Sequence, residues 1–472
     1  MRTYRHDVGP LAYASPGVIL LALGGGALAV AGVLALGCRG LASAASVPIV
    51  GAVGHMMGQA AAVALGAGVV ALIAAAAVRF WMPDCAKIRY KVRRALCHPC
   101  CGNPLHLRDG EKLPAVICIA VCKGIYELTI KGGAVTVETI ADAASAISSA
   151  LDGKYVQYAI TQTDTGVAFD RVTFKVEDVT FDRTLTFSDV EQMRPKSPTK
   201  LMVQNGTEID LTTSGSILCA GKTRSGKTTG IIALLIQVLL AGPDSHGGKI
   251  TIIDPKQAEL SRLPYVISLD EDGEAKAILN AVKQFAASIK NRQKILNDLS
   301  LAKGDAIKWW DAKMCPSFLF LDEYVSLRAI LPSKAAKDDP EYCLATFDSY
   351  IKRIVTMGAS AGCYVIISIA EASVQEGGLP AMLRSAMSTR ILFRPSRSEA
   401  LLMWDKVKID PLPERVYGPG DAWFSSTDGV HDNVSYVHFP KMDFPVYREL
   451  GRLLALYYAD APDDAPPPPC ET

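Results

Sequence analysis

The pattern of apolar residues separates an N-terminal segment from the rest of the chain. Residues 16–37 are uncharged and apolar, and a second uncharged run extends from about residue 57 to residue 78. As a helix rising about 1.5 Å per residue, each run can cross a hydrocarbon layer of about 30 Å. Phe80 and Trp81 follow the second run, where interfacial aromatic residues are expected. Residues 1–81 are therefore predicted to be a membrane anchor with two transmembrane helices.

A signal peptide is the alternative interpretation of the first run, and Ala42-Ser43-Ala44 resembles a cleavage site. The apolar stretch is about twice the usual length of a signal-peptide core, which favours a transmembrane helix. Two buried core helices fit less well, because neither run has a polar face. Six glycines in the two runs are expected to permit close helix packing: Gly24, Gly25, Gly26, Gly32, Gly66 and Gly68.

Basic residues lie mainly outside the two apolar runs. Arg39 is the only charged residue between them, whereas eight basic residues flank them: Arg2, Arg5, Arg79, Lys87, Arg89, Lys91, Arg93 and Arg94. The positive-inside rule predicts a multi-pass protein of the cell membrane, with both termini and the body in the cytoplasm. The mean hydropathy of +0.20 has its origin in this anchor.

The part of the body from residue 82 to residue 200 has short alternating runs. Residues 82–108 form a basic juxtamembrane segment, and a small α+β domain follows. Its expected strands and helix are residues 126–130, 156–161, 172–179 and 137–151. Residues 191–200 contain two prolines and indicate a linker.

Residues 201–444 alternate continuous apolar strands with helices, which predicts an α/β domain with a parallel sheet covered on both faces. Residues 445–472 are expected to form a C-terminal helix and a disordered, proline-rich tail. Ligands of such sheets gather at the carboxyl ends of the strands.

A phosphate-binding loop is predicted between the first strand and the first helix of this domain. Gly221 is followed by four residues and then by Gly226-Lys227-Thr228, with apolar strand and helix patterns on either side. The backbone N–H groups and the helix start favour a phosphate chain, and Lys227 is expected to reach the β- and γ-phosphates. The predicted ATP-binding residues are Gly221, Lys222, Thr223, Arg224, Ser225, Gly226, Lys227, Thr228 and Thr229.

Two adjacent carboxylates, Asp322 and Glu323, follow an apolar strand about a hundred residues later. We expect Asp322 to act on Mg²⁺, which the Thr228 hydroxyl also holds, and Glu323 to orient and deprotonate the attacking water. Lys227, Asp322 and Glu323 are therefore predicted catalytic residues of an ATPase with ATP and Mg²⁺ as cofactors.

The net charge and the cysteine content say less about the binding partners of the chain than the motifs do. The chain has 49 Lys and Arg against 48 Asp and Glu, so a contact with DNA must come from a local patch. Cys97 and Cys100, with Cys118 and Cys122, have a spacing that zinc can use. The alternative is that Cys118 and Cys122 are small apolar residues of an ordinary strand.

Four landmarks of residues 201–443 resemble the FtsK/SpoIIIE family of DNA-pumping ATPases, within the wider HerA-FtsK group. They are residues 221–228, residues 253–261 with Asp254-Pro255-Lys256, the pair Asp322-Glu323, and residues 388–391 with Gly418-Pro419-Gly420-Asp421. In layout, a membrane hairpin followed by a single ATPase domain, the chain is similar to TcpA-like conjugative coupling proteins.

The resemblance implies a RecA-like domain, a ring that is a hexamer, and sequence-independent DNA translocation in conjugative transfer, with contacts to other transfer-machine proteins. It also implies an arginine supplied by the neighbouring subunit, for which Arg390 is the first candidate, with Arg384 and Arg397 nearby. The family's γ-phosphate-sensing Thr-Gln-Arg-Pro is replaced at residues 369–372, and Ser368 is a nearby polar candidate.

Pore-facing cations are expected to grip the DNA backbone, and the candidates are Arg262, Lys290, Arg292 and Lys294. Two alternatives remain: a protein-translocating ATPase similar to those of type VII secretion, and a nucleotide-binding membrane scaffold without turnover. The intact Lys227 and Glu323 disfavour the scaffold.

Overall fold

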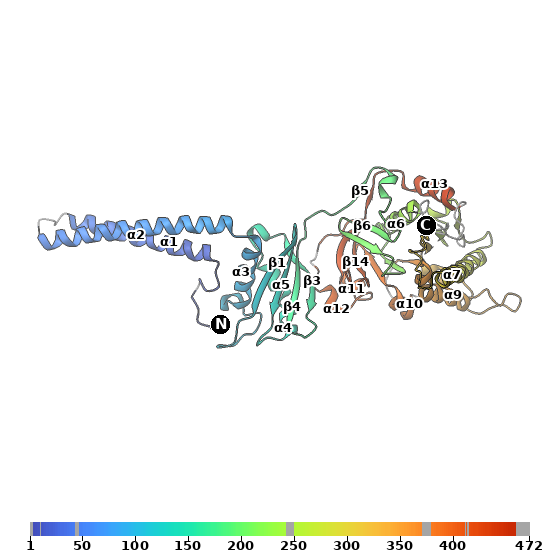
Figure 1. Cartoon of the computed structure of the whole chain (residues 1–472), viewed down its shortest axis with the longest axis horizontal. Coiled ribbons are helices and arrows are strands. Elements are labelled where there is room, and N and C mark those ends of the chain that lie inside the picture. Colours follow the sequence, from blue (N-terminus) through green and yellow to red (C-terminus); the bar gives the residue numbers. More distant parts are fainter. Residues whose placement is uncertain are drawn as a thin grey trace. The chain divides into compact units, whose positions relative to one another are not determined.

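The computed structural model describes residues 3–9, 11–42, 47–241, 250–370, 379–410, 412 and 415–458. The chain divides into two compact units, Met1–Phe181 and Asp182–Thr472 (Figure 1). The second unit begins earlier than the expected boundary at residue 200. The reason is that β5 (Thr186–Phe187) pairs with β16 (Lys441–Met442), while Met193 of η3 (Val190–Met193) is buried in the core of the second unit.

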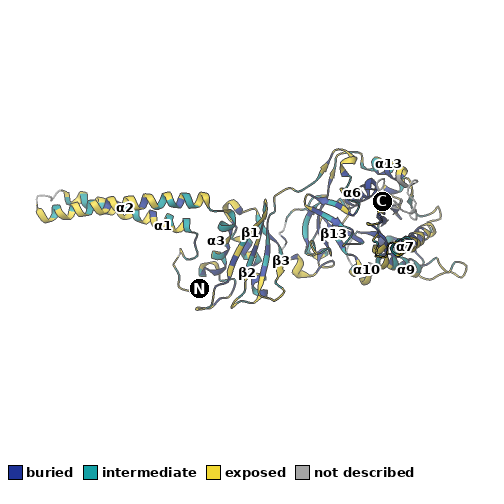
Figure 2. Cartoon of the chain, viewed as in Figure 1, coloured by how far each residue is buried: buried dark blue, intermediate teal, exposed yellow. Residues whose placement is uncertain are grey.

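The two apolar runs are helices, α1 (Pro16–Ala42) and α2 (Pro48–Trp81), of 27 and 34 residues. Among the described residues, these two helices are long and apolar enough to cross a membrane. Figure 2 shows them exposed along most of their length. Length, composition and exposure thus agree with the predicted anchor, and the span itself belongs to the proposal below.

Small residues that recur every seven positions lie where α1 meets α2. On α1 the small residues are Gly17, Gly24, Ala31 and Cys38, and on α2 they are Gly54, Ala61, Gly68 and Ala75. A Cβ added at Gly24 would lie 3.1 Å from the carbonyl oxygen of Gly68. The close packing therefore involves only two of the six expected glycines. A Cβ at Gly25, Gly26, Gly32 or Gly66 would meet nothing within 4 Å, because these residues face away from the partner helix.

The rest of the first unit is an antiparallel sheet with helices on it. The sheet order is β1-β2-β4-β3, with bounds Ala115–Cys122, Ile125–Lys131, Arg171–Asp178 and Tyr158–Thr165. The helical elements are α3 (Asp84–Cys97), η1 (Pro99–Cys101), α4 (Val137–Asp142), α5 (Ala144–Ser149) and η2 (Gly153–Tyr155). Ile88, Val92 and Leu96 recur every four residues on α3 and pack into the core against the sheet. The single helix expected at residues 137–151 is divided into α4 and α5 at Ala143.

The second unit is built on an eight-stranded sheet within the described part of the chain. Its order is β10-β9-β11-β12-β8-β13-β14-β15, parallel from β10 to β13 and antiparallel at β14 and β15. The bounds in this order are Val266–Ile267, Ile250–Ile253, Ser317–Leu321, Cys363–Ile369, Ile217–Ala220, Thr389–Phe393, Asp421–Ser426 and Ser435–His438. A separate hairpin pairs β6 (Lys200–Gln204) with β7 (Thr207–Asp210). This is the expected α/β class.

Helices cover both faces of this sheet. Their bounds are α6 Lys227–Ala241, η5 Leu260–Arg262, α7 Lys276–Lys303, α8 Tyr324–Ile330, α9 Leu344–Met357, η6 Gly358–Ala361, α10 Ala381–Ala386, α11 Arg397–Ala400, α12 Lys406–Ile409 and α13 Val446–Tyr458. Alternate residues of β11 belong to different cores: Phe318 and Phe320 pack with α6 and α13, and Leu319 and Leu321 pack with α7 and α9. The predicted strands are apolar throughout because both of their faces are buried.

Candidate nucleotide-binding and hydrolysis site

The predicted phosphate loop connects β8 to α6 at the carboxyl edge of the parallel strands. Gly226 has φ +88°, and a Cβ there would lie 2.5 Å from the backbone nitrogen of Gly420. Both the left-handed backbone and the close approach require glycine. Gly221 donates its N–H to the carbonyl of Ile369 at the end of β12 (3.2 Å). The end of β12 therefore holds the first glycine of the loop, and the turn before β14 packs closely against the second.

Lys227 is the first residue of α6, and only 9 % of it is exposed. Its Nζ donates to the Ile369 carbonyl (2.9 Å) and lies 4.0 Å from Oε2 of Glu323. Burial lowers the pKa of Lys227, and the carboxylates of Glu323 and Asp322 oppose that shift. The cation of the loop is thus held beside the two predicted catalytic carboxylates.

Asp322 follows β11 directly and lies beside β9, since its N–H donates to the carbonyl of Ile253 (3.0 Å). Burial raises the pKa of the Asp322 carboxyl, and the Ser368 hydroxyl on β12 and the Lys227 ammonium both act against this rise. A desolvated carboxylate facing a lysine is favourably placed to meet a divalent cation, which restores the missing opposite charge.

Glu323 has a left-handed backbone, with φ 50° and ψ 60°, at the start of α8. Such a conformation costs about 1–3 kcal/mol for a residue other than glycine and is concentrated at functional sites. Its Oε2 lies 3.0 Å from Nζ of Lys256, in addition to its approach to Lys227. Two lysines from different strand ends therefore converge on the predicted base.

Asp254 holds the loop of residues 253–261, the second of the four landmarks, in place. The carboxylate is fully buried and accepts hydrogen bonds from the N–H groups of Lys256 (3.1 Å), Ala258 (2.9 Å) and Ser261 (3.2 Å). This arrangement fixes the loop after β9 and places Lys256 beside Glu323. The Asp-Pro-Lys stretch was recognised from the sequence, but no role was predicted for Lys256. A lysine three residues after the end of β9 was the available signal.

The glycine-rich fourth landmark supports the phosphate loop. Gly420 donates its N–H to the carbonyl of Ser225 (2.9 Å). Asp421 holds the turn, because its Oδ2 accepts from the Gly418 N–H (2.6 Å) and its Oδ1 accepts from the Tyr436 hydroxyl (2.6 Å). Two motifs about 200 residues apart in the sequence are thus one structural element at the site.

Arg390 lies away from the loop of its own chain. It pairs with Leu218 on β8, before the carboxyl edge, and its guanidinium donates to the carbonyls of Met403 and Arg384 (3.1 Å for Arg384). Burial lowers the pKa of Arg390. The other named candidates are also bonded within the chain, Arg384 to the Leu402 carbonyl (2.8 Å) and Arg397 to the Leu412 carbonyl (3.0 Å).

Arg394 was missed by the sequence analysis. It follows β13 directly, with φ 47°, and its side chain is exposed at the sheet edge that carries the phosphate loop. Its N–H donates to the carbonyl of Asp421 (2.7 Å). The position of Arg394, three residues after the landmark at residues 388–391, was the available signal.

The γ-phosphate sensor falls only partly within the described residues. Ser368 is buried on β12, between β11 and β8, and its hydroxyl acts on Asp322 as stated above. Residues 371 and 372 lie outside the described residues.

One of the four proposed DNA-gripping cations is wrong. Arg292 is fully buried and donates to the carbonyls of Ala361 (2.7 Å) and Cys315 (2.8 Å), so it ties α7 to the start of β11 and cannot face a pore. Its place on the inner face of α7 follows from the helical period. Arg262, Lys290 and Lys294 are exposed.

The cysteine cluster does not assemble. Among the described residues, no group of three or more His, Cys, Asp or Glu side chains could hold a metal ion. Burial raises the pKa of the Cys97 thiol to about 11 and that of Cys118 to about 12. Cys118 and Cys122 lie on the strand β1, as the alternative interpretation expected; Cys118 packs against the apolar core, whereas Cys122 is exposed.

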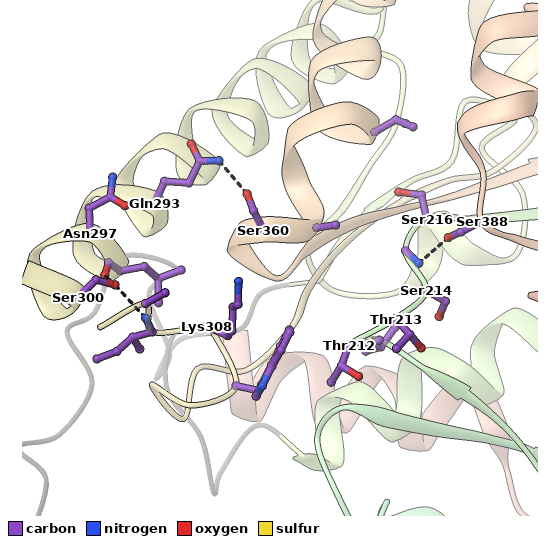
Figure 3. A pocket seen from close by; sticks show the side chains of 18 of the residues that line it. Thr212, Thr213, Ser214, Ser216, Gln293, Asn297, Ser300, Lys308, Ser360 and Ser388 are labelled. Carbon is purple, nitrogen blue, oxygen red and sulfur yellow. Dashed lines mark hydrogen bonds between the residues drawn. The ribbon is translucent and has the colours of Figure 1, made fainter. Parts of the chain in front are cut away.

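A hollow of about 760 Å³ lies at the opposite edge of the sheet, where β8 and β13 begin (Figure 3). Hydroxyl groups line it, and most of them are already bonded within the chain. Ser388 accepts from the Gly215 N–H, Ser216 accepts from the Val365 N–H, and Ser360 bonds the Gln293 amide. The hollow contains none of the predicted site residues, so it is separate from the nucleotide site.

The geometry fits ATP and Mg²⁺. Gly221–Thr229 would hold the phosphates, and Thr228 and Asp322 would hold the metal ion, because a glycine turn, a helix start and a desolvated carboxylate meet at one edge. Glu323 is the adjacent base. The arrangement supports nucleotide hydrolysis.

Comparison with protein-family models matches residues 189–374 to the FtsK/SpoIIIE family. The DNA translocase FtsK of Campylobacter jejuni subsp. jejuni is 25% identical over 234 residues, which cover 48% of this chain and 23% of that protein. The FtsK of Helicobacter pylori is 25% identical over 199 residues, covering 41% and 22%. The chain therefore spans about a quarter of the length of these curated relatives.

Among solved structures, the pCW3 conjugation coupling protein TcpA is similar with a TM-score of 0.47 at 16% identity, covering 78% of this chain and 99% of that one. The type VII secretion ATPase EccC of Thermomonospora curvata has a TM-score of 0.40 at 16% identity, covering 60% and 34%. Residues 189–374, which bring the phosphate loop, the Asp-Pro-Lys loop and Asp322-Glu323 together at one sheet edge, match the model of the FtsK/SpoIIIE family, and this part of the chain is similar to that family.

Proposed function

We propose that the chain is a membrane-anchored ATPase that moves DNA and serves as a coupling protein in conjugative transfer. The observation that carries the proposal is the position of Glu323, which lies beside Lys227 of the phosphate loop at the carboxyl edge of the sheet. A base next to a phosphate-binding cation is the arrangement that nucleoside-triphosphate hydrolysis requires. The family match and the relatives named DNA translocase support DNA as the cargo.

The residues of the chain have defined roles in this proposal. Lys227 and the N–H groups of the loop bind the phosphates, and Glu323 accepts the proton of the attacking water. Bound Mg²⁺ supplies charge neutralisation at the β- and γ-phosphates. Oε2 of Glu323 lies 4.0 Å from Nζ of Lys227 and 3.0 Å from Nζ of Lys256. The phosphates of a bound nucleotide would compete with Glu323 for Lys227.

Different observations support the membrane anchor and the ring. The length, hydropathy and exposure of α1 and α2 support the anchor, and the basic residues after α2 support a cytoplasmic position of the second unit. The position of Arg390 supports a ring, proposed to be a hexamer. The guanidinium of Arg390 donates to the carbonyls of Met403 and Arg384 in its own chain, so we assign its catalytic role to the site of a neighbouring subunit.

The test is the ATPase rate of the detergent-solubilised full chain with unrelated single- and double-stranded DNA at rising salt. We expect stimulation that is insensitive to sequence and fades steeply with salt, because contacts with phosphates release counterions. Lys227→Ala is the matched control and should show no turnover with any DNA. An absence of stimulation by either form at low salt would contradict DNA as the cargo and favour a protein client.

Two exposed lysines of α7 provide a second comparison. Lys290→Gln with Lys294→Gln should reduce the salt dependence of DNA stimulation, whereas Lys303→Gln at the end of the same helix is the control. Equal salt slopes for both variants would remove this face of α7 from the DNA path.

A further inference from the structure

The first unit contains a hollow of about 860 Å³ where the helical hairpin meets α3. Its walls differ in chemistry. Val18 and Leu21 of α1, with Leu72, Ala75 and Ala76 of α2, form an apolar wall. These residues belong to the two helices that are apolar enough to span a membrane. The hollow is therefore continuous with the surface that a bilayer would cover.

The remaining wall is strongly basic. Five basic side chains line the hollow, and Asp152 is the only acidic one among the described lining residues; the basic residues are Arg79, Lys87, Lys91, Arg94 and Lys154. Lys91 pairs with Asp152, while Lys87 (3.9 Å) and Lys154 (3.0 Å) share Asp84 just outside the lining. Within the described chain, no carboxylate pairs with Arg79 or Arg94. The cations outnumber the carboxylates around this hollow.

Part of this excess positive charge is withdrawn from water, which limits its screening by solvent. The side chain of Lys91 is only 32 % exposed. Its pKa is lowered, first by burial and then by the nearby charge of Arg79. An anion in the hollow would remove this like-charge repulsion. Phe80 and Trp81, exposed by 84 % and 79 %, mark the same end of α2 as a level where amphipathic rings meet a membrane surface.

We propose that this hollow binds the headgroup of an anionic phospholipid, with Arg79, Lys91 and Arg94 around the phosphate and the apolar wall of α1 and α2 along an acyl chain. The inference rests on the membrane anchor of the proposed function. A soluble phosphate would use only the basic wall, whereas a phospholipid uses both walls, since each acyl CH₂ that is buried adds its own stabilisation. The lipid is therefore the occupant that matches the whole cavity.

The test measures lipid binding to the detergent-solubilised full chain by native mass spectrometry. The probes are phosphatidylglycerol and phosphatidylcholine with identical acyl chains. We expect phosphatidylglycerol to bind at least about tenfold more tightly. Arg79→Gln with Lys91→Gln should weaken its binding about 25-fold, because each basic residue near an anionic surface contributes about fivefold. Phosphatidylcholine binding should weaken less, because its choline cation offsets the charge of its phosphate.

Three controls make the result specific. Arg39→Gln lies at the other end of the hairpin, and Lys131→Gln is exposed on β2, so neither should alter the preference. Arg79→Lys with Lys91→Arg keeps the charges and should keep the binding, which separates charge loss from misfolding. Equal affinity for the two lipids, or no effect of the double glutamine variant, overturns the lipid site. So does glycerol 3-phosphate competing as strongly as the lipid.

Failure of the lipid site is distinguishable from failure of the anchor. Membranes containing the chain are washed with alkaline carbonate, which removes peripheral proteins. A chain that is released has no membrane anchor, and the proposed function fails at that point. A chain that stays in the membrane but shows no lipid preference contradicts only the phospholipid site.

Discussion

At the scale of single residues, the backbone fixes the positions of the charged side chains at the candidate hydrolysis site. Glu323 is held in a left-handed conformation at the start of α8, and Lys227 is held in the first turn of α6. Their side chains lie 4.0 Å apart because β11 and β8, on either side of β12, end at the same edge of the sheet. The local strain at Glu323 is offset by the packing of Tyr324 and Leu321 on either side of it.

Replacing Glu323 with Gln should abolish turnover while nucleotide binding is retained. An amide cannot accept a proton from water, and the loss of a general base costs about 10²–10⁴ in rate. Steady-state ATPase and fluorescent-nucleotide binding measure the two effects. Lys256→Gln is the comparison variant, because it removes the 3.0 Å partner of Glu323 and leaves the base in place. Hydrolysis by Glu323→Gln at the parent rate would show that another group is the base.

At the scale of elements, the hairpin and the first-unit sheet depend on different forces. The helices α1 and α2 approach closely through small residues, a contact that suits the proposed membrane span, in which lipid would provide no hydrophobic drive between helices. The helix α3 is amphipathic and buries Ile88, Val92 and Leu96 against the sheet. Its first residue, Asp84, accepts a hydrogen bond from the Tyr155 hydroxyl (2.7 Å) and fixes the end of α3 against η2.

Gly24→Ile should separate the hairpin, whereas Gly25→Ile should not. A Cβ at Gly24 would lie 3.0 Å from the Leu72 side chain and 3.1 Å from a backbone oxygen that cannot move away. A Cβ at Gly25 would meet nothing within 4 Å, and the two variants are otherwise matched in helix propensity. Resistance of the solubilised chain to unfolding by SDS is the measurement. Equal resistance of both variants would contradict the helix contact.

Asp84→Asn should destabilise the first unit at neutral pH and have little effect in acid. The Tyr155 hydroxyl is the main cause that lowers the pKa of Asp84, with Lys154 and Lys87 adding to it. Stability from a carboxylate with a lowered pKa is fully present above its unfolded pKa and is lost as the pH falls through the lower folded value. A hydrogen bond to a charged group contributes about 1.5–3 kcal/mol, and partial exposure reduces that figure here.

Hydrogen exchange of the β2 and β4 amides in the full chain measures this effect. Asp142→Asn, exposed at the end of α4, is the control and should leave protection unchanged. A destabilisation by Asp84→Asn that is the same at acidic and neutral pH would contradict the electrostatic origin.

At the scale of the whole molecule, the second unit presents one functional sheet edge. The ends of β8, β9, β11 and β13 bring the phosphate loop, Lys256, Asp322-Glu323 and Arg394 to that edge. The hollow at the opposite edge carries none of these groups. In the proposed ring, the remaining catalytic charge comes from the neighbouring subunit.

Arg390→Ala rings should be inactive alone and regain ATPase activity when mixed with Lys227→Ala subunits. At some mixed interfaces an intact loop faces an intact Arg390, so part of the activity returns. Steady-state ATPase across mixing ratios measures the rescue, and Arg394→Ala mixed in the same way is the comparison. Inactivity with a lowered melting temperature and no rescue would assign Arg390 to its bonds with Met403 and Arg384.

The sequence by itself determined the two apolar helices, the α/β class of the second unit and the phosphate loop. Each of these rests on local chemistry. The two helices are predicted from the length and hydropathy of their apolar runs. Parallel strands that are buried on both faces are apolar throughout. The phosphate loop requires glycine at position 226, where φ is +88°. Asp322 and Glu323 were identified because they follow an apolar strand about a hundred residues after the phosphate loop.

Only the tertiary structure decided which residues meet. Strand order places β9 and β12 beside β11 and β8, which brings Lys256 to Glu323 and the Ile369 carbonyl to Lys227. The orientation of α7 buries Arg292. The orientations of α1 and α2 bring Gly24 and Gly68 into the helix contact and leave Gly25 and Gly66 outside it. The sequence lists the charges and small residues, but long-range packing sets the distances on which their energies depend.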